Sequence, residues 1–130
     1  MFYDGHCGLC HRAVRFVLAR DPDGKAFRFA PLGGPTFAAL VPQAARERLP
    51  DSLVVLTVSG ELRLRSDAVL FIGDRLGGLW RILARSAGLI PQRLRDDWYD
   101  FVAQRRRRWF RASSDVCPVV DDALRRRFEP

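Results

Sequence analysis

The spacing of apolar residues changes several times along the chain between the period of a strand and the period of a helix. Four short apolar or alternating runs predict strands: 1–3, 27–30, 53–58 and 61–65. The last two are joined by Ser59-Gly60 and form the clearest hairpin of the sequence. Helical spacing or composition marks five other stretches: 9–20, 36–49 with Pro42 breaking it into two short helices or one broken helix, 66–77, 80–87 and 93–108.

The order of these elements predicts a single α/β domain over residues 1–130. Strands and helices alternate in the first half of the chain and only helices follow, so we expect a small central mixed sheet of about four strands flanked by helices. A helical extension is expected from about residue 77, and a short tail over 113–130. With 130 residues, 48% of them hydrophobic, the chain can bury one core without disulfides.

Two cysteines lie where the first predicted strand passes into the first predicted helix. Cys7 and Cys10 stand three residues apart, so they share one face of the first helical turn. There the unpaired backbone N–H groups and the positive end of the helix dipole favour a thiolate. A disulfide that closes so short a loop gains only about 2 kcal/mol from chain entropy, so it exchanges readily. The pair predicts thiol–disulfide chemistry, and its place after the first strand is the thioredoxin-like arrangement.

Metal or haem binding is a less favoured interpretation of this pair. A structural zinc site usually takes four nitrogen or sulfur ligands, and a second Cys-x-x-Cys is missing from the sequence. Cys7 to His11 matches the Cys-x-x-Cys-His pattern of haem attachment, but the only methionine is Met1, so a sixth ligand has no obvious source. We therefore predict neither a metal nor a cofactor, and a metal-binding module remains an alternative.

The cysteine count and the N-terminal residues bear on the compartment. Three cysteines without a cysteine-rich spacing fit a reducing environment, and Cys117 is expected to be an inert thiol. The sequence shows no basic region followed by an apolar run at its start, and no apolar stretch of the roughly 18 residues that a membrane span needs. We expect a cytoplasmic protein.

Positive charge is concentrated near the C-terminus. The net charge is +7, Lys25 is the only lysine, and arginines crowd 105–108 and 125–127. Aromatic residues interleave with the first of these runs: Trp98, Tyr99, Phe101, Trp109 and Phe110. Their core-facing spacing favours a packed helix with a solvated basic face over a nucleic-acid site. A weak contact with a membrane surface or an acidic partner fits this face, and a non-enzymatic module that docks there is the alternative function.

Several motifs spaced along the chain form a recognisable set. They are Tyr3-Asp4-Gly5 followed by Cys7 and Cys10, then Ser66-Asp67-Ala68, Ile90-Pro91, and an aromatic and arginine-rich segment that ends in a cysteine. Together they resemble the DCC family of thiol-disulfide oxidoreductases, which is named for the spacing Asp-x-x-Cys-x-x-Cys. The resemblance extends from Phe2 to about Cys117 and implies a thioredoxin-like fold with a redox-active dithiol.

Roles for the residues of the first motif follow from this chemistry. We expect Cys7 to attack a disulfide, because the N-terminal cysteine is nearest the helix end, and Cys10 to resolve the mixed disulfide. Asp4 can accept hydrogen bonds from the following turn, or shuttle a proton to Cys10 if it is buried. A protonated His6 would lower the pKa of Cys7, and Gly8 permits close approach of a partner. The alternative is that His6 and Gly8 are only turn residues.

Ser66 and Asp67 are the candidate substrate-binding residues. Their position resembles the one from which glutaredoxins hold glutathione at a helix N-terminus, although plain N-capping explains the same residues more simply. The expected partners are disulfide or dithiol substrates, with thioredoxin, glutaredoxin and glutathione as candidates. His11 is assigned no role.

Overall fold

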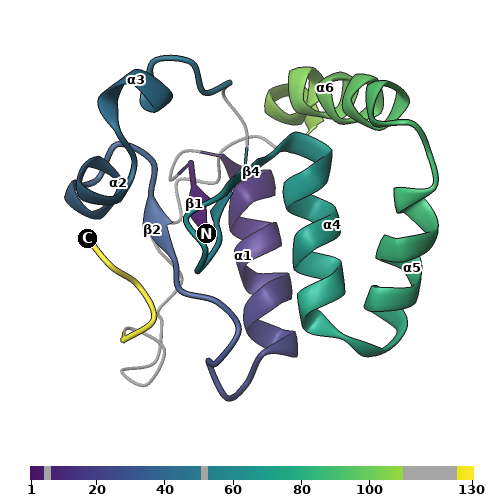
Figure 1. The fold of residues 1–130 in the computed structure, drawn as a ribbon, viewed down its shortest axis with the longest axis horizontal. Helices are drawn as coiled ribbons and strands as arrows, with labels where there is room; N and C mark the ends of the chain where they lie inside the picture. Colours follow the sequence, from purple (N-terminus) through teal and green to yellow (C-terminus); the bar gives the residue numbers. More distant parts are fainter. Residues whose placement is uncertain (5–6, 51–52, 110–125) are drawn as a thin grey trace.

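A four-stranded mixed sheet forms the centre of the molecule (Figure 1). The computed structural model describes residues 1–4, 7–50, 53–109 and 126–130. Its strands are β1 (Phe2–Tyr3), β2 (Ala30–Pro31), β3 (Val54–Leu56) and β4 (Leu62–Leu64), in the order β2-β1-β3-β4. β1 pairs parallel with β2 and antiparallel with β3, and β3 pairs antiparallel with β4. The α/β prediction is confirmed, and the arrangement is consistent with a thioredoxin-like fold.

Helices cover both faces of this sheet. α1 (Gly8–Arg20) and α4 (Arg65–Leu76) pack on one face, and α2 (Pro35–Leu40) and α3 (Gln43–Arg46) on the other. Successive residues of a strand point to opposite faces, so Val54 joins the core under α2 while Val55 joins the core under α1 and α4. Burial on both faces explains why this strand reads as a continuous apolar run.

Several predicted boundaries shift. Pro42 divides the stretch 36–49 into α2 and α3, as one of the two expected outcomes. The predicted strand at 27–30 is wrong in its limits, because regular pairing begins only at Ala30. The hairpin loop has three residues rather than two, since the Thr57 N–H donates to the Glu61 carbonyl and Gly60 adopts a φ of +86°.

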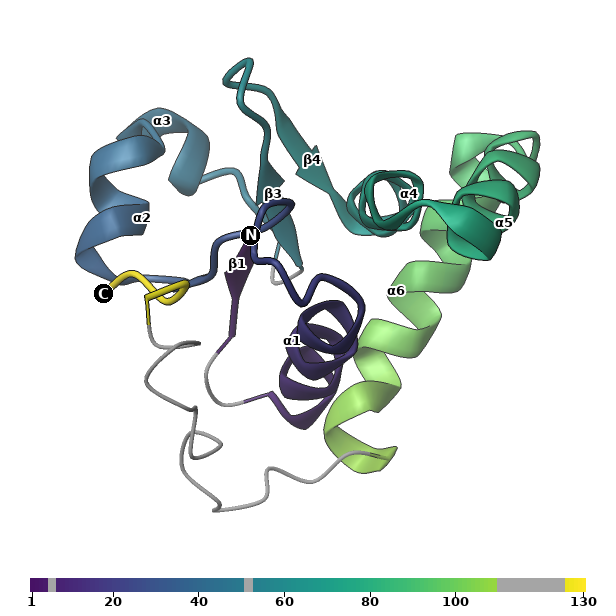
Figure 2. The same cartoon turned by 90° about the horizontal axis from the view of Figure 1, so that it is seen from below.

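The C-terminal half supplies two more helices. α5 (Gly78–Gly88) packs against α4, and α6 (Gln92–Trp109) contacts both α1 and α4 (Figure 2). Both helices lie close to their predicted limits. None of the helices in the described ranges combines the length and the apolar character needed to cross a membrane. The predicted tail over 113–130 is described only from residue 126 onward.

The last residues of the chain return to the sheet. Phe128 forms a parallel bridge with Phe29, which lies just before β2. The Arg127 guanidinium donates to the Asp21 carboxylate at 2.6 Å and to the Asp21 carbonyl at 2.6 Å, and each of the two side chains is only 8% exposed. The end of α1 and the end of the chain are thus joined by a buried ion pair.

Candidate active site

The chain enters α1 through Cys7. The Cys7 backbone is extended, with φ −104° and ψ 113°, and this residue is the N-cap of the helix. Its N–H donates to the Asp4 carbonyl at 3.2 Å, and its own carbonyl accepts the N–H of His11 at 3.1 Å. Cys10 therefore lies in the first helical turn, as the sequence pattern predicts, and Cys7 lies just before it.

The two thiols have different surroundings. Cys7 is half-buried, whereas Cys10 is only 6% exposed, and both are free thiols. The Cys10 side chain hydrogen-bonds to that of Cys7. An incoming disulfide can therefore approach Cys7 more easily than Cys10. Cys10 is buried and lies within reach of the Cys7 sulfur.

Burial also changes the acidity of the second thiol. It raises the pKa of Cys10 from 9.0 to about 12, and the hydrogen bond and charge of Cys7 act in the same direction. A backbone hydrogen bond from Asp4 and the positive charge of Arg106 oppose this effect. Cys10 is consequently a thiol at neutral pH and needs local help to become a nucleophile.

This acidity predicts how Cys10 responds to alkylation. Only the thiolate reacts, so the alkylation rate of Cys10 should rise about tenfold per pH unit from neutral pH to near pH 12. Mass-spectrometric fragmentation of the tryptic peptide that carries both cysteines locates the label, and circular dichroism at each pH checks that the protein stays folded. A rate that levels off near pH 9.0, the ordinary value for a thiol, would contradict the burial effect.

The other predicted residues of the first motif are placed only in part. Asp4 is half-buried, and its backbone makes the contacts described above to Cys7 and Cys10. Gly8 is the first residue of α1. His6 lies outside the described residues. The backbone of Asp4 thus contacts both cysteines, and the roles predicted for its carboxylate and for His6 remain predictions.

Tyr99 and Arg106, both on α6, also lie near Cys10, and neither was predicted for the site. The Tyr99 hydroxyl accepts the N–H of Leu53 at 3.0 Å, just before β3. Burial raises the pKa of Tyr99, and the nearby Cys10 adds to the rise. Arg106 is 4% exposed, which corrects the predicted solvated basic face at this position. The sequence signal that could have linked Tyr99 with Arg106 is their spacing, since residues seven apart share a helix face.

These groups meet at an apolar cavity of about 500 Å³. Cys10, Tyr99 and Arg106 lie in its wall together with Arg95 and Ser66. The other lining residues are apolar: Leu9, Ala13, Leu53, Val69, Leu70, Ala87, Ile90, Leu94, Trp98, Val102 and Ala103. The second thiol therefore faces a mainly apolar space that is lined by residues of α1, α4, α5 and α6.

Ser66 and Asp67 hold α4 against α6. The N-cap of α4 is Leu64, without a side-chain hydrogen bond, so the N-capping interpretation is wrong. The Ser66 hydroxyl instead donates to Asp96 at 2.5 Å, and Asp67 forms an ion pair with Arg95 at 3.1 Å. These contacts link helices around the cavity, and the substrate-binding role of the two residues stays a prediction.

The neighbouring aromatic and basic residues of α6 divide between surface and core. Arg105 and Arg108 are exposed, as predicted for the basic face. Trp98 is 69% exposed, and Phe101 and Trp109 are also exposed, so the expectation that these aromatic rings face the core is wrong. Arg105 lies over the Phe101 ring at 3.9 Å, which shields part of that ring from water. Phe110 and Cys117 lie outside the described residues.

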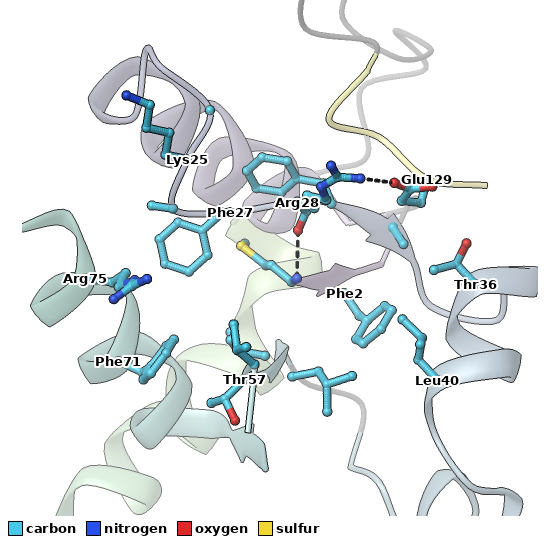
Figure 3. A pocket seen from close by; sticks show the side chains of 18 of the residues that line it. Phe2, Lys25, Phe27, Arg28, Thr36, Leu40, Thr57, Phe71, Arg75 and Glu129 are labelled. Carbon is cyan, nitrogen blue, oxygen red and sulfur yellow. Dashed lines mark hydrogen bonds and ion pairs between the residues drawn. The ribbon is translucent and has the colours of Figure 1, made fainter. Parts of the chain in front are cut away.

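A second cavity, of about 1090 Å³, is lined by residues of β1, β2, β3, α2 and α4 and includes neither Cys7 nor Cys10 in its wall (Figure 3). Arg28 and Glu129 form an ion pair at its rim at 2.8 Å. The backbone carbonyl of Arg28 accepts a hydrogen bond from the Met1 amino group. Because Cys10 lies in the wall of the first cavity and is in contact with Cys7, that cavity is the candidate site.

Comparison with known proteins gives a family match and two similar proteins. A family model described as "DCC1-like thiol-disulfide oxidoreductase" matches residues 1–112. The chain is 29% identical over 130 residues to the uncharacterized protein YuxK of Bacillus subtilis (strain 168), covering 100% of this chain and 93% of that protein. It is 33% identical over 119 residues to a chloroplastic DCC family protein of Arabidopsis thaliana, covering 92% of this chain and 68% of the relative. No solved structure matches the chain significantly.

Proposed function

Because this chain belongs to the DCC1-like thiol-disulfide oxidoreductase family, we propose that Cys7 and Cys10 are its redox-active dithiol. The observation that carries the proposal is their unequal exposure within hydrogen-bonding contact, with Cys7 half-buried at the helix N-cap and Cys10 buried behind it. This is the arrangement that sequential attack and resolution require. The substrates are disulfides or dithiols.

The reaction proceeds in two exchanges. The Cys7 thiolate attacks one sulfur of a substrate disulfide, the substrate S–S bond breaks, and the leaving thiolate takes up a proton. A mixed disulfide then joins Cys7 to the substrate. Cys10 loses its proton and attacks the sulfur of Cys7, which releases the second substrate thiol and leaves a Cys7–Cys10 disulfide. The substrate gains two electrons and the protein loses two, and the reverse sequence oxidises a dithiol.

Neighbouring groups support the first exchange. The N-terminal end of α1 places backbone N–H groups and the positive end of the helix dipole close to Cys7, and both stabilise a thiolate. Gly8 has no side chain to obstruct a substrate at this end of the helix. The backbone of Asp4 fixes the position of Cys7. His6 adds positive charge next to Cys7 when its imidazole is protonated.

Trapping of the mixed disulfide tests this function. In a Cys117→Ser background, Cys10→Ser should form a stable adduct at Cys7 when it is mixed with oxidised glutathione or a disulfide-linked peptide, because no thiol remains to resolve it. The matched Cys7→Ser variant should give little adduct, since its remaining thiol is buried. Intact mass and peptide mapping measure both. An adduct that forms mainly on Cys10, or none at all, would refute the proposed roles.

A further inference from the structure

Arg106 is an arginine buried next to the second thiol. Its side chain lies on α6 and is 4% exposed, whereas Arg105 and Arg108 beside it in the sequence are exposed. Burial of a guanidinium costs free energy, and an arginine keeps its charge at any ordinary pH. The run of arginines alone does not explain this position, because only one of these three side chains is taken into the interior.

The fold holds this charge at the wall that contains Cys10. Val102, Ala103 and Arg106 follow Tyr99 by three, four and seven residues, so the four occupy one face of α6, and all of them line the cavity with Cys10. The hydrogen bond from the Leu53 N–H to the Tyr99 hydroxyl fixes this face against the start of β3. Arg106 therefore has a defined position in the cavity wall, on the same face of α6 as Tyr99.

The charge acts directly on the thiol. Among the described groups that influence Cys10, Arg106 is the only side chain that lowers its pKa, against burial and the neighbouring Cys7. It lowers the pKa of Tyr99 as well, so its field extends over both groups. Cys10 and Arg106 are both buried, which strengthens this interaction, because charges attract more strongly where water is excluded.

We propose that Arg106 is the positive charge that enables Cys10 to attack the mixed disulfide. The inference rests on the proposed function and assigns a positioning residue to its second exchange. In that step Cys10 releases a proton to solvent, its thiolate attacks the Cys7 sulfur, the bond between Cys7 and the substrate breaks, and the substrate leaves as a thiolate. Arg106 stabilises the negative charge on Cys10 before the attack and takes no part in bond making.

Other titratable groups near Cys10 differ from Arg106 in their action. Cys7 disfavours the Cys10 thiolate, and Asp4 acts through its backbone. Tyr99 presents a hydroxyl whose own pKa is raised by burial. Arg95 lies in the cavity wall but is paired with Asp67, and Asp96 accepts the Ser66 hydroxyl. Among the described side chains that influence Cys10, Arg106 is therefore the one whose removal takes away a positive charge.

A two-step kinetic experiment tests the role of Arg106. The reduced Cys117→Ser protein is mixed with one equivalent of an aromatic disulfide that releases a coloured thiolate at each exchange, so the first phase reports attack by Cys7 and the second reports resolution by Cys10. Arg106→Met should slow the second phase by at least about threefold, because loss of the charge raises the pKa of Cys10 and the greater nucleophilicity of the more basic thiolate offsets only part of the lost thiolate fraction. The first phase should stay within about twofold of its original rate, and the rise of the second phase with pH should move to higher pH.

Three further variants separate charge from packing. Arg105→Met removes an exposed neighbouring charge and should leave both phases unchanged. Arg106→Gln keeps hydrogen-bonding capacity without charge and should resolve as slowly as Arg106→Met, which provides a second test if the methionine variant does not fold. Arg106→Lys keeps the charge and should resolve within about twofold of the parent protein.

The outcomes distinguish this inference from the proposed function. A parent protein without a second phase would refute the dithiol mechanism itself. A parent protein with both phases, together with a folded Arg106→Met or Arg106→Gln variant that resolves at the parental rate, would overturn only the role of Arg106. A lysine variant as slow as the glutamine variant, or an equal loss in Arg105→Met, would also overturn it.

Discussion

Replacement of Cys7 by serine is expected to lower the rate of disulfide reduction by at least about a thousandfold, because it removes the nucleophile of the covalent pathway. A serine hydroxyl stays protonated at neutral pH and does not exchange with disulfides. The remaining Cys10 cannot substitute for Cys7, since it is buried and its pKa is raised to about 12. Turnover of a model disulfide with an excess of a dithiol reductant measures the loss.

Two matched variants, Cys10→Ser and Cys117→Ser, show whether the loss of activity is specific to Cys7. Cys10→Ser retains the attacking thiol, so it should still complete a first exchange in a single-turnover experiment and then stop. Cys117→Ser should turn over at the parental rate. If Cys7→Ser retained more than about a tenth of the activity, the attacking role would belong to another thiol.

Replacement of Arg127 by alanine is expected to lower the free energy of unfolding by about 3 kcal/mol, because it leaves a buried carboxylate without its charged partner. The Arg127 guanidinium donates to the carboxylate and the carbonyl of Asp21, and also to the Phe27 carbonyl. Backbone N–H groups of residues 25–27 continue to bind the carboxylate, which limits the loss. Urea denaturation followed by circular dichroism measures the change.

Arg28→Ala is the matched control for this effect. Its ion pair with Glu129 also joins the body of the protein to the C-terminal residues, but the two side chains are 74% and 38% exposed. Exposed pairs contribute little, so a loss below about 1 kcal/mol is expected. Equal losses in Arg127→Ala and Arg28→Ala would show that burial of the Asp21 pair does not matter to stability.

The features that the sequence predicted are those set by neighbouring residues. A strand, a glycine-containing turn, two cysteines and a helical period occupy the first 20 residues, and local geometry alone brings Cys7 and Cys10 together at the start of α1. The continuous apolar run at 53–58 likewise predicted β3, because a strand that is buried on both faces needs apolar residues at successive positions.

The features that were missed depend on contacts between distant segments. Arg106 lies 96 residues after Cys10, and its burial depends on how α6 rests on α1 and α4. Within a run of successive arginines, composition alone does not show that Arg106 is buried. Ser66 and Asp67 were misjudged as caps for the same reason, since Asp96 and Arg95 on α6 engage them.

Tertiary contact also decided the exposure of the aromatic residues. Tyr99 and Trp98 are adjacent on α6, yet Tyr99 reaches the start of β3 while Trp98 remains largely in solvent. An amphipathic pattern identifies which face of a helix is apolar, but not how much of that face its neighbours cover. α6 presents a wider apolar face than the rest of the described chain covers.

A redox titration of the dithiol tests the central claim most directly. Cys117→Ser protein is equilibrated in thiol–disulfide buffers of graded potential, quenched by alkylation and weighed intact. We predict a single two-electron transition within or near the range of about −270 to −120 mV found for thioredoxin-like dithiols, in which Cys7 and Cys10 lose their thiols together. Cysteines that never interconvert, or that oxidise independently as separate mixed disulfides, would contradict the assignment of Cys7 and Cys10 as a redox pair.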